Sequence, residues 1–151
     1  MKKSEKKKLT VCESKNLSSF WKILEDNLSS KYDTMPVHSL AEIEYLKEKF
    51  PDNIHLFVVS DPDNKMLGGC LIFEMENIVH AQYTAATEEG KSTGAIDALI
   101  DHIVKTYSHK AYFDYGTSTE NNGLYLNESL IYQKEGFGAR GTVYDTYTMN
   151  L

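Results

Sequence analysis

The stretch Tyr112–Gly141, YFDYGTSTENNGLYLNESLIYQKEGFGARG, contains the clearest signals of fold and site in this chain. Its aromatic start predicts a short strand over Tyr112–Tyr115, followed by a polar loop and a helix that we expect to end at Lys134. Asp114 interrupts the aromatic strand, where an ionised carboxylate is costly unless it is paired or hydrogen-bonded. Lys134 would lie in the last helical turn, where the helix dipole favours a cation. Taken together these features predict a site, although each residue alone also has an ordinary structural interpretation.

The rest of the chain predicts an α+β fold. Apolar residues recur at helical spacing near the N-terminus, Ser39-x-x-Glu42 is a capping-box pattern, and Asp61-Pro62-Asp63-Asn64 is typical of a turn between two apolar strands. The predicted order is strand, two helices, three antiparallel strands, helix, strand, helix and strand. The ranges are Leu9–Glu13, Leu17–Ser30, a helix from Ser39, Ile54–Ser60, Met66–Glu74, Ile78–Ala86, Thr93–Tyr107, Tyr112–Tyr115, the helix ending at Lys134, and Thr142–Leu151. We therefore expect a mixed central sheet of about six or seven strands, flanked by helices, with a splay between the strands ending near Ala86 and Tyr115.

Length and composition agree with one small soluble enzyme domain. The chain has 151 residues, enough to bury about 70% of its unfolded surface, and its formal net charge is −6. Such an acidic chain is not typical of a DNA-binding domain. Cys12 and Cys70 are too few for a zinc site or a disulfide scaffold, so we expect no metal. The basic run MKKSEKKK is not followed by the apolar core of a signal peptide, and no apolar run approaches a membrane span, so we expect a cytoplasmic protein.

The C-terminal stretch resembles the GNAT acyltransferase superfamily. Tyr132-x-Lys134-x-Gly136-Phe137 is similar to the Y-x-K-x-G-F ending of the last conserved GNAT helix. FDYG-x-S followed by LNE-x-LI-x-QKE-x-FG resembles the FemAB-like branch, whose members attach amino acids or acyl groups to amines of cell-wall and surface-polysaccharide precursors. The resemblance implies a single GNAT-like domain over residues 9–151, equivalent to the second, C-terminal domain of such proteins. Residues 1–8 would then be a basic tail or a truncated connector, and an N-terminal GNAT-like domain would be missing.

The resemblance also implies an acyl donor, acetyl-CoA or another acyl-CoA. GNAT enzymes hold its pyrophosphate at a Q/R-x-x-G-x-G/A turn before a helix, through backbone N–H groups and the helix dipole. The segment GKSTGA matches this pattern in part: Lys91 at the first position puts Gly94 on the first glycine, but Ile96 follows where Gly or Ala belongs. An ordinary helix start preceded by two glutamates is the alternative. The candidate cofactor-binding residues are Gly90, Lys91, Ser92, Thr93, Gly94 and Ala95.

The implied reaction is N-acyl transfer to an amine. The amine attacks a thioester carbonyl, so the protein must orient both partners, remove a proton and stabilise the leaving thiolate. By resemblance, Lys134 would stabilise negative charge and Tyr132 would protonate the thiolate. Asp114, Glu120 and His80 are the candidate bases. The catalytic candidates are Lys134, Asp114 and Tyr132, and the substrate-binding candidates are Tyr83, Ser118, Glu120 and Asn121.

Other functions stay open on the sequence alone. A FemAB-type transferase would use aminoacyl-tRNA, which an acidic domain disfavours because phosphate contacts dominate such binding. A non-catalytic GNAT-like binding domain could dimerise through the aromatic strand Thr142–Leu151 at a sheet edge. The expected partner is an amine on a small molecule or on a glycan or peptide precursor of the bacterial cell envelope, and no DNA is expected.

Overall fold

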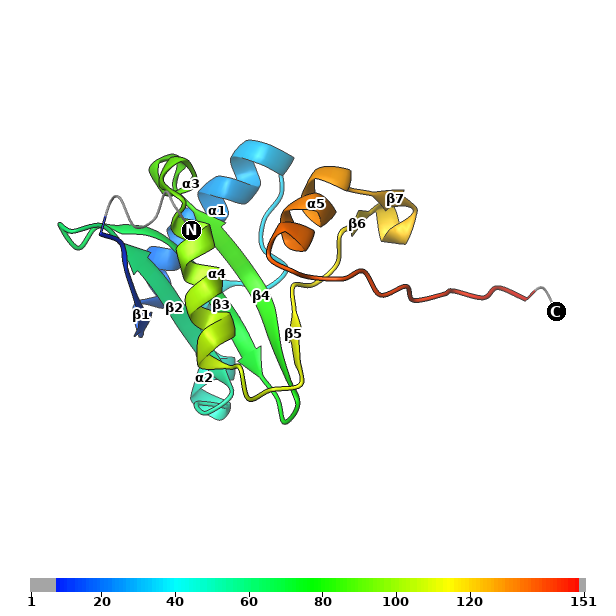
Figure 1. The fold of residues 1–151 in the computed structure, drawn as a ribbon, viewed down its shortest axis with the longest axis horizontal. Coiled ribbons are helices and arrows are strands. Elements are labelled where there is room, and N and C mark those ends of the chain that lie inside the picture. Colours follow the sequence, from blue (N-terminus) through cyan, green and yellow to red (C-terminus); the bar gives the residue numbers. More distant parts are fainter. Residues whose placement is uncertain (1–7, 150–151) are drawn as a thin grey trace. The chain divides into compact units, whose positions relative to one another are not determined.

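The computed structural model describes residues 8–149, whose contacts divide the chain into two compact units, one ending at Gly116 and one beginning at Thr117 (Figure 1). The first unit contains β1 (Thr10–Ser14), α1 (Leu17–Tyr32), α2 (Leu40–Lys49), β2 (Ile54–Ser60), β3 (Met66–Glu74), β4 (Ile78–Ala86), α3 (Glu88–Thr93), α4 (Ala95–Thr106) and β5 (Tyr112–Asp114). The second contains β6 (Thr119–Glu120), a 3-10 turn (Asn121–Gly123), β7 (Tyr125–Leu126) and α5 (Glu128–Gly136). The single domain over residues 9–151 stays a prediction, and the predicted tail lies, apart from Lys8, outside the described residues.

The first unit is built on one mixed sheet in the order β1-β2-β3-β4-β5. Its first four strands are antiparallel to their neighbours, and β5 is parallel to β4. The turn between β2 and β3 forms because the Asp61 carboxylate accepts hydrogen bonds from the N–H groups of Asp63 and Lys65, at 3.0 and 2.9 Å. Asn64 takes the left-handed conformation there, with φ of 61°. The bounds of β2, β3 and β4 are those predicted from the sequence.

Helices cover both faces of this sheet (Figure 1). On one face α1 and α2 pack against the sheet through a cluster that includes Phe20, Ile43 and Leu71, each fully buried. On the other face α4 packs through Leu99 and Ile103, which are also fully buried. Burying an aliphatic or aromatic side chain of this size stabilises the fold by about 1.5–3 kcal/mol relative to leaving it exposed. The predicted α+β fold with a helix-flanked mixed sheet is confirmed.

The strand β4 has two irregularities that shape the site. Leu71 of β3 lies opposite Tyr83, while the next residue of β3 lies opposite Ala81, so Gln82 is an extra residue that forms a β-bulge. On its other side β4 pairs with β5 only over Ile78–His80. The remainder of β4, through Ala86, runs on past the end of β5, while all three residues of β5 pair with β4, so the splay between the two strands stays a prediction.

The predicted C-terminal strand is wrong over the described residues. Residues 142–149 form no strand, and Asn150 and Leu151 lie outside the described part of the chain. The large apolar side chains of this segment are 79–91% exposed: Val143, Tyr144, Tyr147 and Met149. β-branched and aromatic residues favour strands because they fit a pleated, half-buried surface, and this segment contributes to none. The sheet consequently has five strands rather than six or seven, with β6 and β7 forming a separate pair in the second unit.

Candidate functional site

The end of β5 brings Asp114 beside His80 of β4. Parallel pairing places the two residues opposite each other, and Oδ2 of Asp114 lies 2.7 Å from Nδ1 of His80. The other carboxylate oxygen accepts a hydrogen bond from the N–H of Gly116 at 2.8 Å. The side chains of His80 and Asp114 are 26% and 44% exposed, so the pair is partly shielded but reachable. The sequence named both residues as candidate bases, and the fold joins them into one pair.

This pair has the geometry of a general base. An ionised Asp114 accepts the proton of Nδ1, which fixes the histidine tautomer and leaves a lone pair on Nε2. Within the described residues no hydrogen bond engages Nε2 of His80. The backbone turns at Gly116, whose φ of 72° favours glycine, and a Cβ there would lie 3.7 Å from Cε1 of the imidazole. An imidazole held in this way can take a proton from an attacking amine.

Tyr83, a predicted substrate-binding residue, lies on the same face of the sheet as His80. Tyr83 is opposite Leu71 and His80 is opposite Phe73, and both of these β3 residues pack in the cluster under α1 and α2. The Tyr83 hydroxyl lies 2.8 Å from Nδ1 of His38, in the connection between α1 and α2. Sequence reasoning missed His38, since nothing local in the chain links it to a residue 45 positions away.

The predicted cofactor-binding segment forms α3 and the start of α4 rather than an open turn. Thr87 accepts a hydrogen bond from the N–H of Gly90, and a Cβ on Gly90 would lie 2.2 Å from the carbonyl oxygen of Leu67. Close packing of α3 on β3 therefore explains this glycine. The Ser92 and Thr93 hydroxyls both donate to carbonyls within α3. The four candidates of α3 are Gly90, Lys91, Ser92 and Thr93, and the Lys91 ammonium is also engaged, 2.5 Å from a carboxylate oxygen of Glu88.

The last two candidates, Gly94 and Ala95, lie at the N-terminus of α4. Gly94 is the N-cap residue, with φ of 77°, and it offers no side-chain cap. The first intrahelical hydrogen bond of α4 runs from the N–H of Ala98 to the carbonyl of Gly94, so the amides of residues 95–97 have no partner in the helix itself. Such amides suit an anion, although the Asp97 carboxylate shares this first turn.

The remaining candidates belong to the second unit. The Lys134 ammonium donates to the carbonyl of Thr117 at 2.5 Å, so this lysine is held by the polar loop that the sequence singled out. Glu120 accepts a hydrogen bond from the Asn127 side chain, whose own oxygen caps α5. Tyr132 is 79% exposed on α5. The two other candidates, Ser118 and Asn121, lie in the same loop, before and after β6.

A cluster of charged side chains occupies another part of the first unit. The Lys110 ammonium donates to a Glu74 carboxylate oxygen at 2.8 Å and to the carbonyls of Met75 and Glu76, and its side chain is only 12% exposed. The hydrogen bond from Lys110 holds the pKa of Glu74 below its usual range. Burial, together with the Glu74 charge, raises the pKa of Tyr107. All of these groups are paired, which indicates a structural role.

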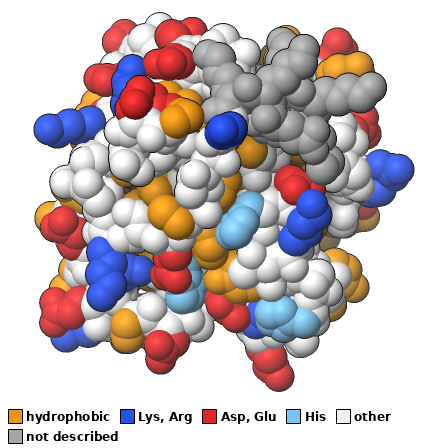
Figure 2. All heavy atoms as spheres, turned by 60° about the vertical axis from the view of Figure 1, so that its left-hand side comes forward, with side chains coloured by type: hydrophobic (Ala, Val, Ile, Leu, Met, Phe, Trp, Pro, Cys, Tyr) orange, Lys and Arg blue, Asp and Glu red, His pale blue; other side chains and the backbone are white. Residues whose placement is uncertain are grey.

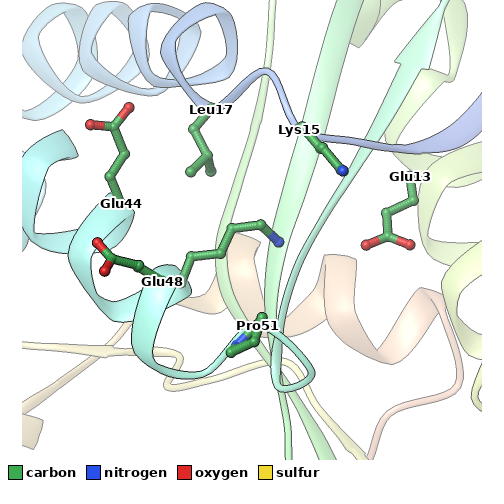
Figure 3. A pocket seen from close by; sticks show the side chains of 7 residues that line it. Glu13, Lys15, Leu17, Glu44, Glu48 and Pro51 are labelled. Carbon is green, nitrogen blue, oxygen red and sulfur yellow. The ribbon is translucent and has the colours of Figure 1, made fainter.

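A separate cavity of about 550 Å³ lies between the end of β1 and α2 (Figure 3). It is lined by side chains of both charges and by two apolar ones: Glu13, Lys15, Leu17, Glu44, Lys47, Glu48 and Pro51. No residue predicted from the sequence to bind or react belongs to this lining. Acidic and basic side chains are similarly interspersed over the face in Figure 2. In residues 8–149 no group of three or more metal-ligating side chains could hold an ion, and no helix is long and apolar enough to cross a membrane.

Comparison with known proteins gives matches in structure but not in sequence. No protein-family profile and no curated protein matches the chain. A possible acetyltransferase from Clostridium difficile 630 has a TM-score of 0.70 at 11% identity, over 95% of this chain and 97% of the other. An aminoglycoside acetyltransferase, meta-AAC0020, from an uncultured soil metagenomic sample in complex with sisomicin has a TM-score of 0.62 at 15% identity, over 94% and 97%.

A third structure is AAC(6')-Iy in complex with the bisubstrate analogue CoA-S-monomethyl-acetylneamine. Its TM-score is 0.60 at 16% identity, over 95% of this chain and 98% of that chain. Identities of this size establish a shared fold and not a shared activity. The protein therefore has the GNAT fold found in these acetyltransferases.

Proposed function

We propose that the protein transfers an acyl group from acyl-CoA to a primary amine of a small-molecule acceptor. The observation that carries this proposal is the His80–Asp114 pair, which lies at the last paired position of β4 and β5. A nucleophilic amine must lose a proton as its nitrogen bonds to the acyl carbon. A half-buried imidazole with its Nδ1 proton fixed by a carboxylate is suited to accept that proton at Nε2.

The reaction balances with groups that this chain supplies. The new N–C bond forms as the C–S bond breaks, the electron pair leaves on sulfur, and the proton of the amine goes to His80. The positive imidazolium is then stabilised by Asp114 at 2.7 Å. We assign Tyr132 and Lys134 to the leaving group, the first as proton donor and the second as a fixed positive charge; this assignment rests on the sequence pattern. Within the second unit, the Lys134 ammonium donates a hydrogen bond to the carbonyl of Thr117.

The start of α4 fits the diphosphate of a CoA donor through main-chain groups. Gly94 leaves the helix end without a side-chain cap, and the amides of Ala95 and Ile96 follow it. Lysine charge contributes little, because Lys91 is paired with Glu88. The part of β4 beyond β5 offers strand-edge N–H and C=O groups to the amides of an extended donor arm. We therefore propose acyl-CoA as co-substrate, held mainly by backbone hydrogen bonds.

The finer assignments from the sequence remain proposals. Membership of the FemAB-like branch, an acceptor amine on a cell-envelope precursor and a cytoplasmic location rest on the sequence pattern alone. The aminoglycoside acetyltransferase bound to sisomicin and the CoA-linked acetylneamine complex support a broader statement, an amine-bearing small molecule as acceptor.

Donor binding and transfer are tested separately. Thermal unfolding is followed with acetyl-CoA, free CoA and ATP, and a donor at one hundred times its Kd should stabilise the fold by about 2.7 kcal/mol. Transfer is followed by release of free thiol with sisomicin, glucosamine, lysine and spermidine as acceptors. Stabilisation by acetyl-CoA and CoA but not by ATP, together with thiol release that depends on an amine, supports the proposal. Absence of any CoA effect would contradict it.

A further inference from the structure

The contact between His38 and Tyr83 joins the connection between α1 and α2 to strand β4. The backbone N–H of His38 donates to the Tyr83 hydroxyl at 3.2 Å, and Nδ1 of the same histidine lies 2.8 Å from that hydroxyl. The Tyr83 ring also meets the rings of Trp21 and His38 edge to face, with centroids 5.4 and 6.0 Å apart. One tyrosine is thus fixed both by its hydroxyl and by its ring.

The segment that carries His38 is otherwise weakly held. Between α1 and α2, Asp33 bonds back to α1 through its N–H, and Ser39 forms the capping box of α2 with Glu42. For the residues between Thr34 and His38 the structure records no hydrogen bond within residues 8–149, and Met35 and Val37 are 60% and 89% exposed. We call residues 33–39 the α1–α2 connector. The His38–Tyr83 contact attaches the α1–α2 connector to the sheet by hydrogen bonds.

This contact lies on the face of β4 that also carries the catalytic candidate His80. The bulge at Gln82 brings Tyr83 to the same side as His80, the side under α1 and α2. The start of α4, where we place the diphosphate of the donor, belongs to the helix on the opposite face. An amine whose proton passes to Nε2 of His80 must approach on the His80 face, beside Tyr83 and the connector.

We propose that His38 is a positioning residue: through Tyr83 it holds the α1–α2 connector beside the His80 face, and this contact determines how tightly the amine acceptor binds. The role in acceptor binding rests on the proposed acyl transfer, whereas the holding of the connector does not. The hydroxyl of Tyr83 has one donor and two acceptor positions, and His38 engages two of these three. Loss of the hydroxyl removes both hydrogen bonds while the ring packing on Trp21 is kept.

The first test measures the connector directly. Hydrogen–deuterium exchange of peptides spanning residues 33–39 is compared in the parent protein, Tyr83→Phe, His38→Ala and His38→Asn. Two hydrogen bonds of ordinary strength correspond to a change of about tenfold or more in local opening. We expect exchange of the amide at position 38, which donates to the Tyr83 hydroxyl, to rise by that factor in Tyr83→Phe, by less in His38→Ala, which keeps the backbone N–H, and little in His38→Asn, whose amide can occupy the place of Nδ1.

The matched control is Tyr45→Phe, which removes a hydroxyl that is exposed on α2 and makes no hydrogen bond within the described residues. Exchange in the connector should be unchanged in this variant. Equal exchange rates in Tyr83→Phe and in the parent protein would overturn the proposal. The melting temperature of each variant is also measured. A variant that is destabilised as a whole is recognised by a lower melting temperature and by faster exchange throughout the sheet.

The second test uses whichever of sisomicin, glucosamine, lysine and spermidine is acetylated fastest. We expect Tyr83→Phe and His38→Ala to raise the KM of that amine about tenfold, with the KM of acetyl-CoA unchanged and His38→Asn restoring the amine KM. An unchanged amine KM together with faster exchange would overturn the acceptor role and leave only the structural contact. If the parent protein acetylates none of these amines and acetyl-CoA does not stabilise it, the proposed function is wrong. The exchange experiment alone then tests whether the His38–Tyr83 contact holds the connector in place.

Discussion

Replacing Asp114 with Asn tests whether the His80–Asp114 pair acts as a general base. In the parent protein one carboxylate oxygen accepts from the N–H of Gly116 at 2.8 Å, and the other lies 2.7 Å from Nδ1 of His80. An asparagine amide offers only one oxygen. If that oxygen stays with Gly116, the amide N–H faces Nδ1 and drives the imidazole proton to Nε2, the wrong tautomer for a base. If the amide flips, an N–H faces the N–H of Gly116.

The size of the effect follows from these contacts. A positioned general base contributes about 10²–10⁴-fold to rate, so kcat/KM should fall by that factor, which corresponds to roughly 3–5 kcal/mol of barrier. Stability should change far less, because the Asp114 side chain is 44% exposed and the variant loses about one hydrogen bond, worth about 0.5–1.5 kcal/mol. The melting temperature should drop by only a few degrees, about 2–4 °C per kcal/mol for a chain of this size.

The assay is thiol release from acetyl-CoA across pH 5.5–9, with acetyl-CoA-induced stabilisation measured in parallel. Asp114→Asn should lower the rate throughout this pH range while donor stabilisation stays intact. Asp101→Asn is the matched control, because Asp101 pairs with Lys105 on the surface of α4 and not with a histidine. A rate within threefold of the parent at every pH would refute the assignment of this pair as the base.

Three further predictions concern the first unit. Gly90→Ala should cost about 1–3 kcal/mol, measured by denaturant unfolding, because its Cβ would lie 2.2 Å from the carbonyl oxygen of Leu67; an unchanged midpoint would contradict the close packing. Lys110→Met should cost about 1–3 kcal/mol since three acceptors lose their partner, whereas Lys105→Met, an exposed helix pair, should cost under about 0.5 kcal/mol. Because the folded pKa of Glu74 is lowered, its contribution is present above its unfolded pKa and is lost as pH falls through the folded value; the melting temperature of Glu74→Gln should therefore depend less on pH below about 4.3 than that of the parent.

The elements that local chemistry determines could be predicted from the sequence. The bounds of β2, β3 and β4 follow from apolar runs separated by turn residues, and the capping box at Ser39 and Glu42 forms as expected, with both of its hydrogen bonds present. Turns and helix caps depend on side chains within four residues of one another, so they can be predicted without knowledge of the tertiary structure.

The features that depend on distant partners could not be predicted in the same way. His80 and Asp114 were candidates one by one, but their pairing needs the parallel register of β4 and β5, two strands 34 residues apart. The contact of His38 with Tyr83 could not be predicted, because a histidine in a polar connection between helices is expected to lie on the surface. The strand predicted at Thr142–Leu151 failed for the opposite reason: its composition suits a strand, yet a strand forms only against a partner.

The bulge at Gln82 lies between His80 and Tyr83, the two residues of β4 that the proposed site uses. Deleting Gln82 tests whether the bulge is needed for donor binding. In a regular strand, residues three apart point to opposite faces, so His80 and Tyr83 share a face only because one extra residue lies between them. The cross-strand pairs on either side continue without Gln82, Ala81 with Ile72 and Tyr83 with Leu71, so the deletion should keep the fold and a melting temperature within a few degrees. A bulge also bends and twists its strand, and this one lies two residues after His80, the last residue of β4 that pairs with β5. A straightened β4 should therefore remain closer to β5, and the deletion should abolish stabilisation by acetyl-CoA while circular dichroism stays that of the parent. Donor binding undiminished in a folded deletion variant would show that the separation of the two strands does not depend on the bulge.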